Sequence, residues 1–91
     1  MKVFQTTTFE RKYKKLKSNQ LLLVNEAIES IISDPEVGNL KRGDLGSIRV
    51  HKFRKSTVEV LIAYWTAENS IHLIDFGSHE NFYRDLKRKL K

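Results

Sequence analysis

The sequence has 91 residues, which is enough for one domain with two layers and a modest hydrophobic core. Apolar residues make up 40% of it, which argues against intrinsic disorder, and the lack of cysteine excludes disulfides and thiolate metal sites. Seventeen Lys and Arg residues against eleven Asp and Glu residues give a net charge of +6, which favours a polyanionic partner such as nucleic acid or the ribosome.

No stretch of the sequence is expected to cross a membrane or to direct secretion. The longest apolar run, Leu21–Val24, is far shorter than the roughly 20 residues of a transmembrane helix. Met1 is followed by charged and polar residues, and not by the apolar run that is typical of a signal peptide. Together with the lack of cysteine, these features predict a cytoplasmic protein without a membrane partner.

The first half of the chain predicts one strand followed by a helical hairpin. Residues Val3–Thr7 are rich in β-forming residues and predict the strand. Thr8 is expected to cap a short helix with an apolar stripe at positions i, i+4 and i+7, formed by Phe9, Tyr13 and Leu16. A second helix is predicted over residues 20–33, and Pro35 ends it because the residue before a proline avoids the helical region.

The second half predicts three strands and a C-terminal helix. The strands follow a glycine-containing loop and are expected over residues 48–53, 58–65 and 71–76. After Gly77, Ser78 is a candidate N-cap for a basic helix that runs to the end of the chain. The order β-α-α-β-β-β-α predicts an α+β domain over residues 1–91. Its sheet is small, antiparallel-rich and four-stranded, with the helical hairpin on one face and a short C-terminal helix.

Alternation along the strand at 48–53 divides its side chains between the two faces of the sheet. Ile48 and Val50 point one way, and Arg49 and His51 point the other way. Because the apolar pair belongs in a core, we expect it under the helices and expect Arg49 and His51 on the open face. Farther along the chain, His79 and Tyr83 are four residues apart and are expected to share one face of a helix.

Several short motifs, in their order and spacing, resemble toxins of the RelE/ParE superfamily from type II toxin–antitoxin systems. The resemblance covers nearly the whole chain. It rests on Pro35, Gly38, Leu40-Lys41, Ile48–His51, Leu61–Tyr64 and Gly77–Tyr83. Within the superfamily, Gly-Ser-His followed by an aromatic residue looks most like the YafQ/RelE branch of mRNA interferases. The resemblance implies a single RelE-like toxin domain that acts as a ribosome-dependent mRNA endonuclease, inhibits translation and uses neither metal nor cofactor.

The resemblance also implies the partners of the protein. These are a cognate antitoxin, the ribosome with its mRNA, and operator DNA that is reached only through the antitoxin complex. An alternative is the ParE branch, which shares the fold but inhibits DNA gyrase without catalysis and does not need His79 or Tyr83. A basic RNA-binding module without toxicity is a third interpretation.

Matched positions give roles to four candidate catalytic residues. Cleavage of RNA by its own 2′-hydroxyl needs a base, an acid and a cation at the phosphate, and His and Arg suit these tasks. On this basis His79 is the acid, His51 the base and Arg49 the phosphate ligand, although the order of proton transfer between the histidines is left open. Tyr83 stacks on or orients the nucleotide. The candidate RNA- and phosphate-binding residues are Lys41, Arg42, Lys52 and Arg54.

A zinc site is not expected. It would have to be built from His51, His72, Asp75 and His79, and their spacing fits no recurring zinc motif.

Overall fold

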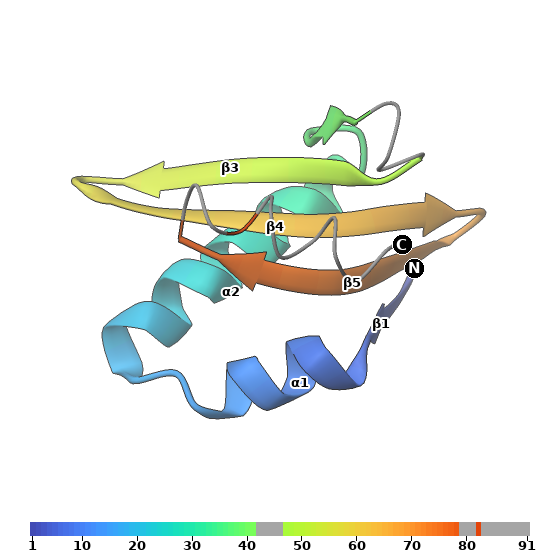
Figure 1. The fold of residues 1–91 in the computed structure, drawn as a ribbon. Helices are drawn as coiled ribbons and strands as arrows, with labels where there is room; N and C mark the ends of the chain where they lie inside the picture. The colour runs from blue at the N-terminus through green and yellow to red at the C-terminus, as the bar shows by residue number, and fades with distance from the viewer. Residues whose placement is uncertain (42–46, 79–81, 83–91) are drawn as a thin grey trace.

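Residues 1–41, 47–78 and 82 are described by the computed structural model of the chain. They form a five-stranded sheet in the order β1-β5-β4-β3-β2, with two helices on one of its faces (Figure 1). In chain order the elements are β1 (Lys2–Gln5), α1 (Thr7–Lys14), α2 (Ser18–Ser33), β2 (Asn39–Leu40), β3 (Arg49–Lys55), β4 (Val58–Ala67) and β5 (Ser70–Gly77). β1 runs parallel to β5, and the other neighbouring strands are antiparallel.

The α+β class is confirmed, but the predicted count of four strands is wrong. The additional strand, β2, has two residues, and it pairs with Val50 and Arg49 of β3. It lies in the segment predicted as a loop, where so short a strand leaves no periodic pattern to detect. The predicted C-terminal helix lies outside the described residues, except for Phe82, which is buried.

The helices begin earlier than predicted because their caps differ. The N-cap of α1 is Thr6, and its Oγ1 accepts a hydrogen bond from the backbone N–H of Phe9 at 3.1 Å. α2 begins at Ser18 and ends at Ser33, and the Asp34-Pro35 pair stops it as expected. The apolar faces of both helices lie against the same face of the sheet.

The sheet has a hydrophobic core on each face. The larger core lies under the helices and joins Phe9, Val24 and Ile31 to β4 and β5. The smaller core lies on the opposite face and contains Ile48, Val50, Leu61, Ala63 and Phe82. β4 contributes side chains to both cores, which accounts for its nearly continuous apolar sequence.

A buried tyrosine connects the end of α2 to the centre of the sheet. The Tyr64 hydroxyl donates to the carbonyl of Pro35 at 2.8 Å and accepts from the backbone N–H of Gly38 at 2.9 Å. A Cβ at Gly38 would lie 2.8 Å from the Tyr64 ring, so this position requires glycine. These contacts fix the loop that leads into β2.

Candidate functional site

β3 places Arg49 and His51 beneath the helices, so the expectation that they lie on the open face is wrong. His51 pairs with Ile62 of the helix-side core and is only 9% exposed. The Arg49 guanidinium donates to the carbonyl of Gly38 at 2.9 Å and lies 3.9 Å from the Glu36 carboxylate. The physical reason is the second core: Ile48 and Val50 are indeed buried, but on the face opposite the helices.

The environment of His51 is desolvated. Its Nε2 is buried and has no hydrogen-bond partner among the described residues, and its ring lies 5.9 Å from that of Phe53. Burial lowers the pKa of His51 below its ordinary value of 6.5, so the imidazole is neutral near pH 7. A neutral imidazole is able to accept a proton, but this one is buried on the helix side of the sheet.

The face opposite the helices is covered at its centre by the smaller core, and we keep the name open face for it. It carries a different set of charged residues at the end of β3. Lys52 and Arg54 alternate with the helix-side residues, and Arg54 lies opposite Glu59 of β4 in the register. The Glu59 Oε2 atom is 3.8 Å from Lys52 Nζ and 3.8 Å from Arg54 Nε. The side chain of Glu59 is 12% exposed, whereas Lys52 and Arg54 are 61% and 70% exposed. One shielded carboxylate therefore lies between two accessible cations.

These residues line a cavity of about 380 Å³ at the end of β5. The lining consists of Lys52, Arg54, Thr57, Val58, Glu59 and Ser78. The register explains how distant segments meet here, since Leu61 of β4 pairs with both Lys52 and Gly77. Ser78, which lines the cavity, follows Gly77 at the end of β5 and precedes His79 in the sequence. We call the group Lys52, Arg54, Glu59 and Ser78 the open-face site.

The other predicted site residues are not brought to this cavity by the described structure. The Lys41 backbone N–H donates to the carbonyl of Ile48 at 2.8 Å, which places Lys41 at the start of β3, whereas the cavity lies at its end. Arg42, His79 and Tyr83 lie outside the described residues. Their roles stay predictions, as do those of Lys52 and Arg54.

Sequence reasoning did not select Glu59. The available signal was a single carboxylate inside an otherwise apolar strand, because Val58, Val60 and Leu61 surround it in sequence. Such a residue must be paired when it is partly buried, and the facing strand offered two cations. Strand pairing was needed to identify which charges face it.

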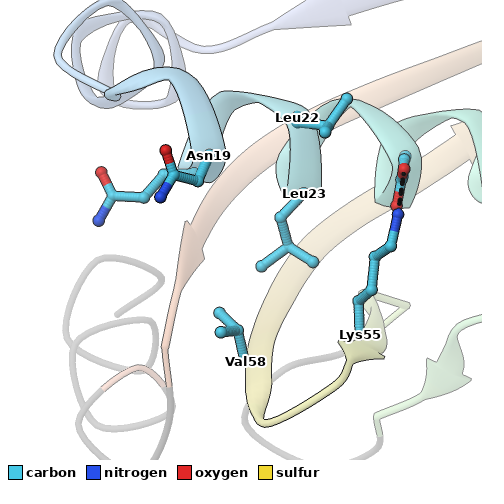
Figure 2. A pocket seen from close by; sticks show the side chains of 7 residues that line it. Asn19, Leu22, Leu23, Lys55 and Val58 are labelled. Carbon is cyan, nitrogen blue, oxygen red and sulfur yellow. Dashed lines mark hydrogen bonds and ion pairs between the residues drawn. The ribbon is translucent and has the colours of Figure 1, made fainter.

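A second cavity, of about 410 Å³, lies between α2 and the β3–β4 hairpin (Figure 2). Leu22, Leu23 and Val58 give it an aliphatic lining, and at its rim Lys55 Nζ lies 2.8 Å from the Glu26 carboxylate. The one cation among the described residues of its lining, Lys55, is already held by this ion pair. The cavity therefore suits an apolar side chain better than a phosphate.

The described residues contain no cluster of three or more His, Asp or Glu side chains that could hold a metal ion. Within the same part of the chain, none of the helices is both long and apolar enough to cross a membrane.

A family model described as the ParE-like toxin of type II bacterial toxin–antitoxin systems matches residues 3–87 of the chain. The chain belongs to this toxin family. The match covers nearly the whole sequence and, apart from Lys2 of β1, includes the helices and strands of the described residues. No curated protein matches the sequence of the toxin.

Two solved structures share the fold of the toxin. A chain of the intact E. coli RelBE toxin–antitoxin complex superposes with a TM-score of 0.65 at 14% identity, covering 87% of the toxin and 96% of that chain. The isolated E. coli RelE toxin gives a TM-score of 0.64 at 11% identity, covering 99% of the toxin and 98% of RelE. At these identities the likeness concerns the fold alone, and the fold of this toxin is RelE-like.

Proposed function

We propose that the toxin is a metal-independent, ribosome-dependent mRNA endonuclease and that the open-face site is its cleavage centre. The observation that carries this proposal is the Glu59 carboxylate, 3.8 Å from both Lys52 and Arg54 at the end of β5. A polyanion is drawn to the accessible cations, and the net charge of +6 adds a favourable long-range field. His79 is the next residue after the cavity, which supports its predicted role there.

The chemistry assigns one task to each group. Glu59 accepts the proton of the 2′-hydroxyl, and the 2′-oxygen attacks the adjacent phosphorus. Lys52 and Arg54 stabilise the negative charge that grows on the phosphate oxygens. His79 gives a proton to the leaving 5′-oxygen, which yields a 2′,3′-cyclic phosphate and a free 5′-hydroxyl. DNA lacks the attacking hydroxyl and is not cleaved.

Glu59 replaces His51 as the base in this scheme because His51 is buried on the other face of the sheet. Arg49 likewise leaves the phosphate-binding role, since its guanidinium is engaged by the carbonyl of Gly38. Arg49 instead joins β3 to the segment after α2, and His51 lies beside Phe53 on the helix side of the sheet. Tyr83 keeps its predicted role of stacking on the nucleotide.

Membership of a type II toxin–antitoxin family supports a cognate antitoxin as one partner. A cognate antitoxin holds the toxin inactive, as the pairing in the RelBE complex illustrates for that toxin. The ribosome and mRNA are the targets in the cytoplasm, and operator DNA is contacted only through the antitoxin complex.

The test is cleavage of mRNA on purified ribosomes, read by primer extension. Glu59→Gln keeps the shape of the side chain but removes the base, so cleavage is expected to fall by about 10²–10⁴-fold. The matched control is Glu29→Gln, which removes the same charge from the exposed face of α2 and should leave cleavage unchanged. Full cleavage by a folded Glu59→Gln toxin would contradict the assignment.

The ParE-like name of the matching family favours a second candidate, inhibition of DNA gyrase without catalysis. Under that function, Glu59→Gln and His79→Ala toxins would still arrest bacterial growth. They would also still block supercoiling by purified gyrase. The nuclease proposal expects both variants to permit growth while they remain folded and able to bind the antitoxin.

A further inference from the structure

Three aromatic rings form a column across the open face, at the end of the sheet opposite the cavity. Trp65 of β4 stacks on His72 of β5 with ring centroids 3.7 Å apart and an interplanar angle of 2°. His72 stacks on Phe4 of β1 at 5.0 Å and 15°. The Ser70 hydroxyl lies 3.0 Å from His72 Nε2 and fixes the central ring. We call Phe4, His72 and Trp65 the aromatic column.

The column belongs to neither hydrophobic core, although its rings are ordered against each other. Phe4 is 48% exposed and Trp65 is 38% exposed. Their neighbours Tyr64 and Leu73 point into the helix-side core, so Trp65 and His72 point to the open face. Large aromatic residues that are stacked and yet exposed are typical of binding surfaces.

We propose that the aromatic column is a stacking subsite for a base of single-stranded RNA whose scissile phosphate lies in the open-face site. This inference rests on the proposed nuclease function. Parallel rings offer the π-face on which nucleobases of any sequence stack. The column ends at Phe4 on β1, the last strand of the sheet, so a base is able to add to the stack there without displacing another strand.

Distance and charge fit the same occupant. Gly77 is five positions after His72 along β5, which corresponds to about 17 Å at roughly 3.3 Å per residue. At about 3.4 Å per stacked nucleotide, this span equals about five nucleotides. The smaller core covers the middle of this face, so a short RNA that reaches both places passes around that core. Lys2 alternates with Val3 along β1 and therefore lies on the same face as Phe4, where it adds a cation beside the column.

The toxin contains one tryptophan, so its fluorescence reports on the column directly. We would titrate the Glu59→Gln toxin, which is not expected to cleave, with a ten-nucleotide oligoadenylate and with an abasic oligonucleotide of equal length. Saturable quenching of Trp65 by oligoadenylate alone is expected. Phe4→Leu should weaken this binding on the order of 5- to 150-fold. Phe4→Tyr keeps the ring and should bind as the parent does, and so should Val3→Ala on the opposite face of the same strand.

Two outcomes would overturn the stacking subsite. Equal quenching by the abasic strand would show that charge alone holds the RNA. Unchanged RNA affinity in Phe4→Leu, combined with loss of a dimer seen by sedimentation, would show that a second copy of the chain covers the column.

These outcomes are separable from failure of the nuclease. Base-dependent quenching in a wild-type toxin that never cleaves would support the subsite and refute the endonuclease. Normal cleavage by the wild-type chain with no effect of Phe4→Leu on affinity would refute only the subsite.

Discussion

The Tyr64 hydroxyl forms two hydrogen bonds to the backbone of the segment after α2, one buried and one partly buried. It is 0% exposed, and it serves the carbonyl of Pro35 and the N–H of Gly38 at the same time. Removing the oxygen leaves the buried N–H of Gly38 without its partner, which costs more than the net value of that bond. The contact was invisible in the sequence, because Tyr64 and Gly38 are 26 residues apart.

Tyr64→Phe is therefore expected to lower the free energy of unfolding by about 1–3 kcal/mol. Urea denaturation followed by circular dichroism measures the change. Tyr13→Phe is the matched control: its hydroxyl bonds Asn25 at 2.6 Å in a half-buried setting, where water replaces the lost partner. A larger loss in Tyr13→Phe than in Tyr64→Phe would contradict this interpretation.

His51 makes the stability of the toxin depend on pH. Its pKa in the folded chain lies below 6.5 because burial disfavours the charged imidazolium. The unfolded chain therefore binds more protons as the pH falls below about 6.5, and stability decreases until the pH passes the folded pKa. The contribution of the neutral His51 side chain to the free energy of unfolding is therefore complete above pH 6.5 and is lost as the pH falls.

We expect the urea midpoint of the wild-type toxin to fall between pH 7.5 and pH 5, with part of the decrease due to this residue. His51→Leu has a similar volume and no titrating group, so its midpoint should fall less over the same range. Parallel curves for the two proteins would show that His51 is not responsible.

At the scale of elements, the helices and strands were largely predictable, but the face of each strand was not. The spacing of apolar residues in α2 matched the observed helix because only one of its faces is buried. Alternation in β3 correctly separated Ile48 and Val50 from Arg49 and His51, yet it gave no sign of which set faces the helices. Both faces of this sheet have a core, so apolar character alone could not decide.

α1 is attached to β5 by one charged contact. Lys12 Nζ lies 2.8 Å from Asp75 Oδ1 and also donates to the carbonyl of Phe76 at 2.8 Å. Asp75 is 1% exposed and lies beside the β4–β5 irregularity between Ala63 and Tyr64. Removing a cation from beside a buried carboxylate is costly, so this pair matters more than an exposed one.

Lys12→Met should keep the aliphatic packing but lower the free energy of unfolding by about 1.5–3 kcal/mol, the range for hydrogen bonds to charged groups. Lys14→Met is the control on the same helix, because its pair with Glu10 at 2.9 Å is solvent-exposed. Exposed pairs of this spacing contribute only about 0.3–0.5 kcal/mol. Thermal or urea unfolding measures the loss of stability in each variant. Equal losses would contradict the expectation that the more buried pair contributes more.

At the scale of the whole molecule, the two faces of the sheet differ in role. The helix side holds residues that pack the fold, and the other face holds the proposed binding sites. The helices cover one face, and His51 and Arg49 are used there for packing. The other face has the open-face site at one end and the aromatic column at the other. Lys52 and Arg54 were candidates from sequence, whereas Glu59 and the column depended on strand register, which a single sequence does not specify.

If RNA contacts the open face, removing cations from that face should make the affinity for RNA less dependent on salt concentration. For single strands, the logarithm of the binding constant changes with the logarithm of salt concentration by about −0.7 for each neutralised phosphate. A Lys52→Ala, Arg54→Ala double variant loses two cations from the open face, so its slope should be shallower by about 1.4. Lys15→Ala removes an exposed cation of the helical hairpin and should leave the slope unchanged.

Fluorescence anisotropy of a labelled oligoribonucleotide between 50 mM and 200 mM salt measures these slopes. The opposite result, a shallower slope for Lys15→Ala and an unchanged slope for the double variant, would place the RNA across the helices. It would contradict both the open-face site and the aromatic column as RNA-binding sites.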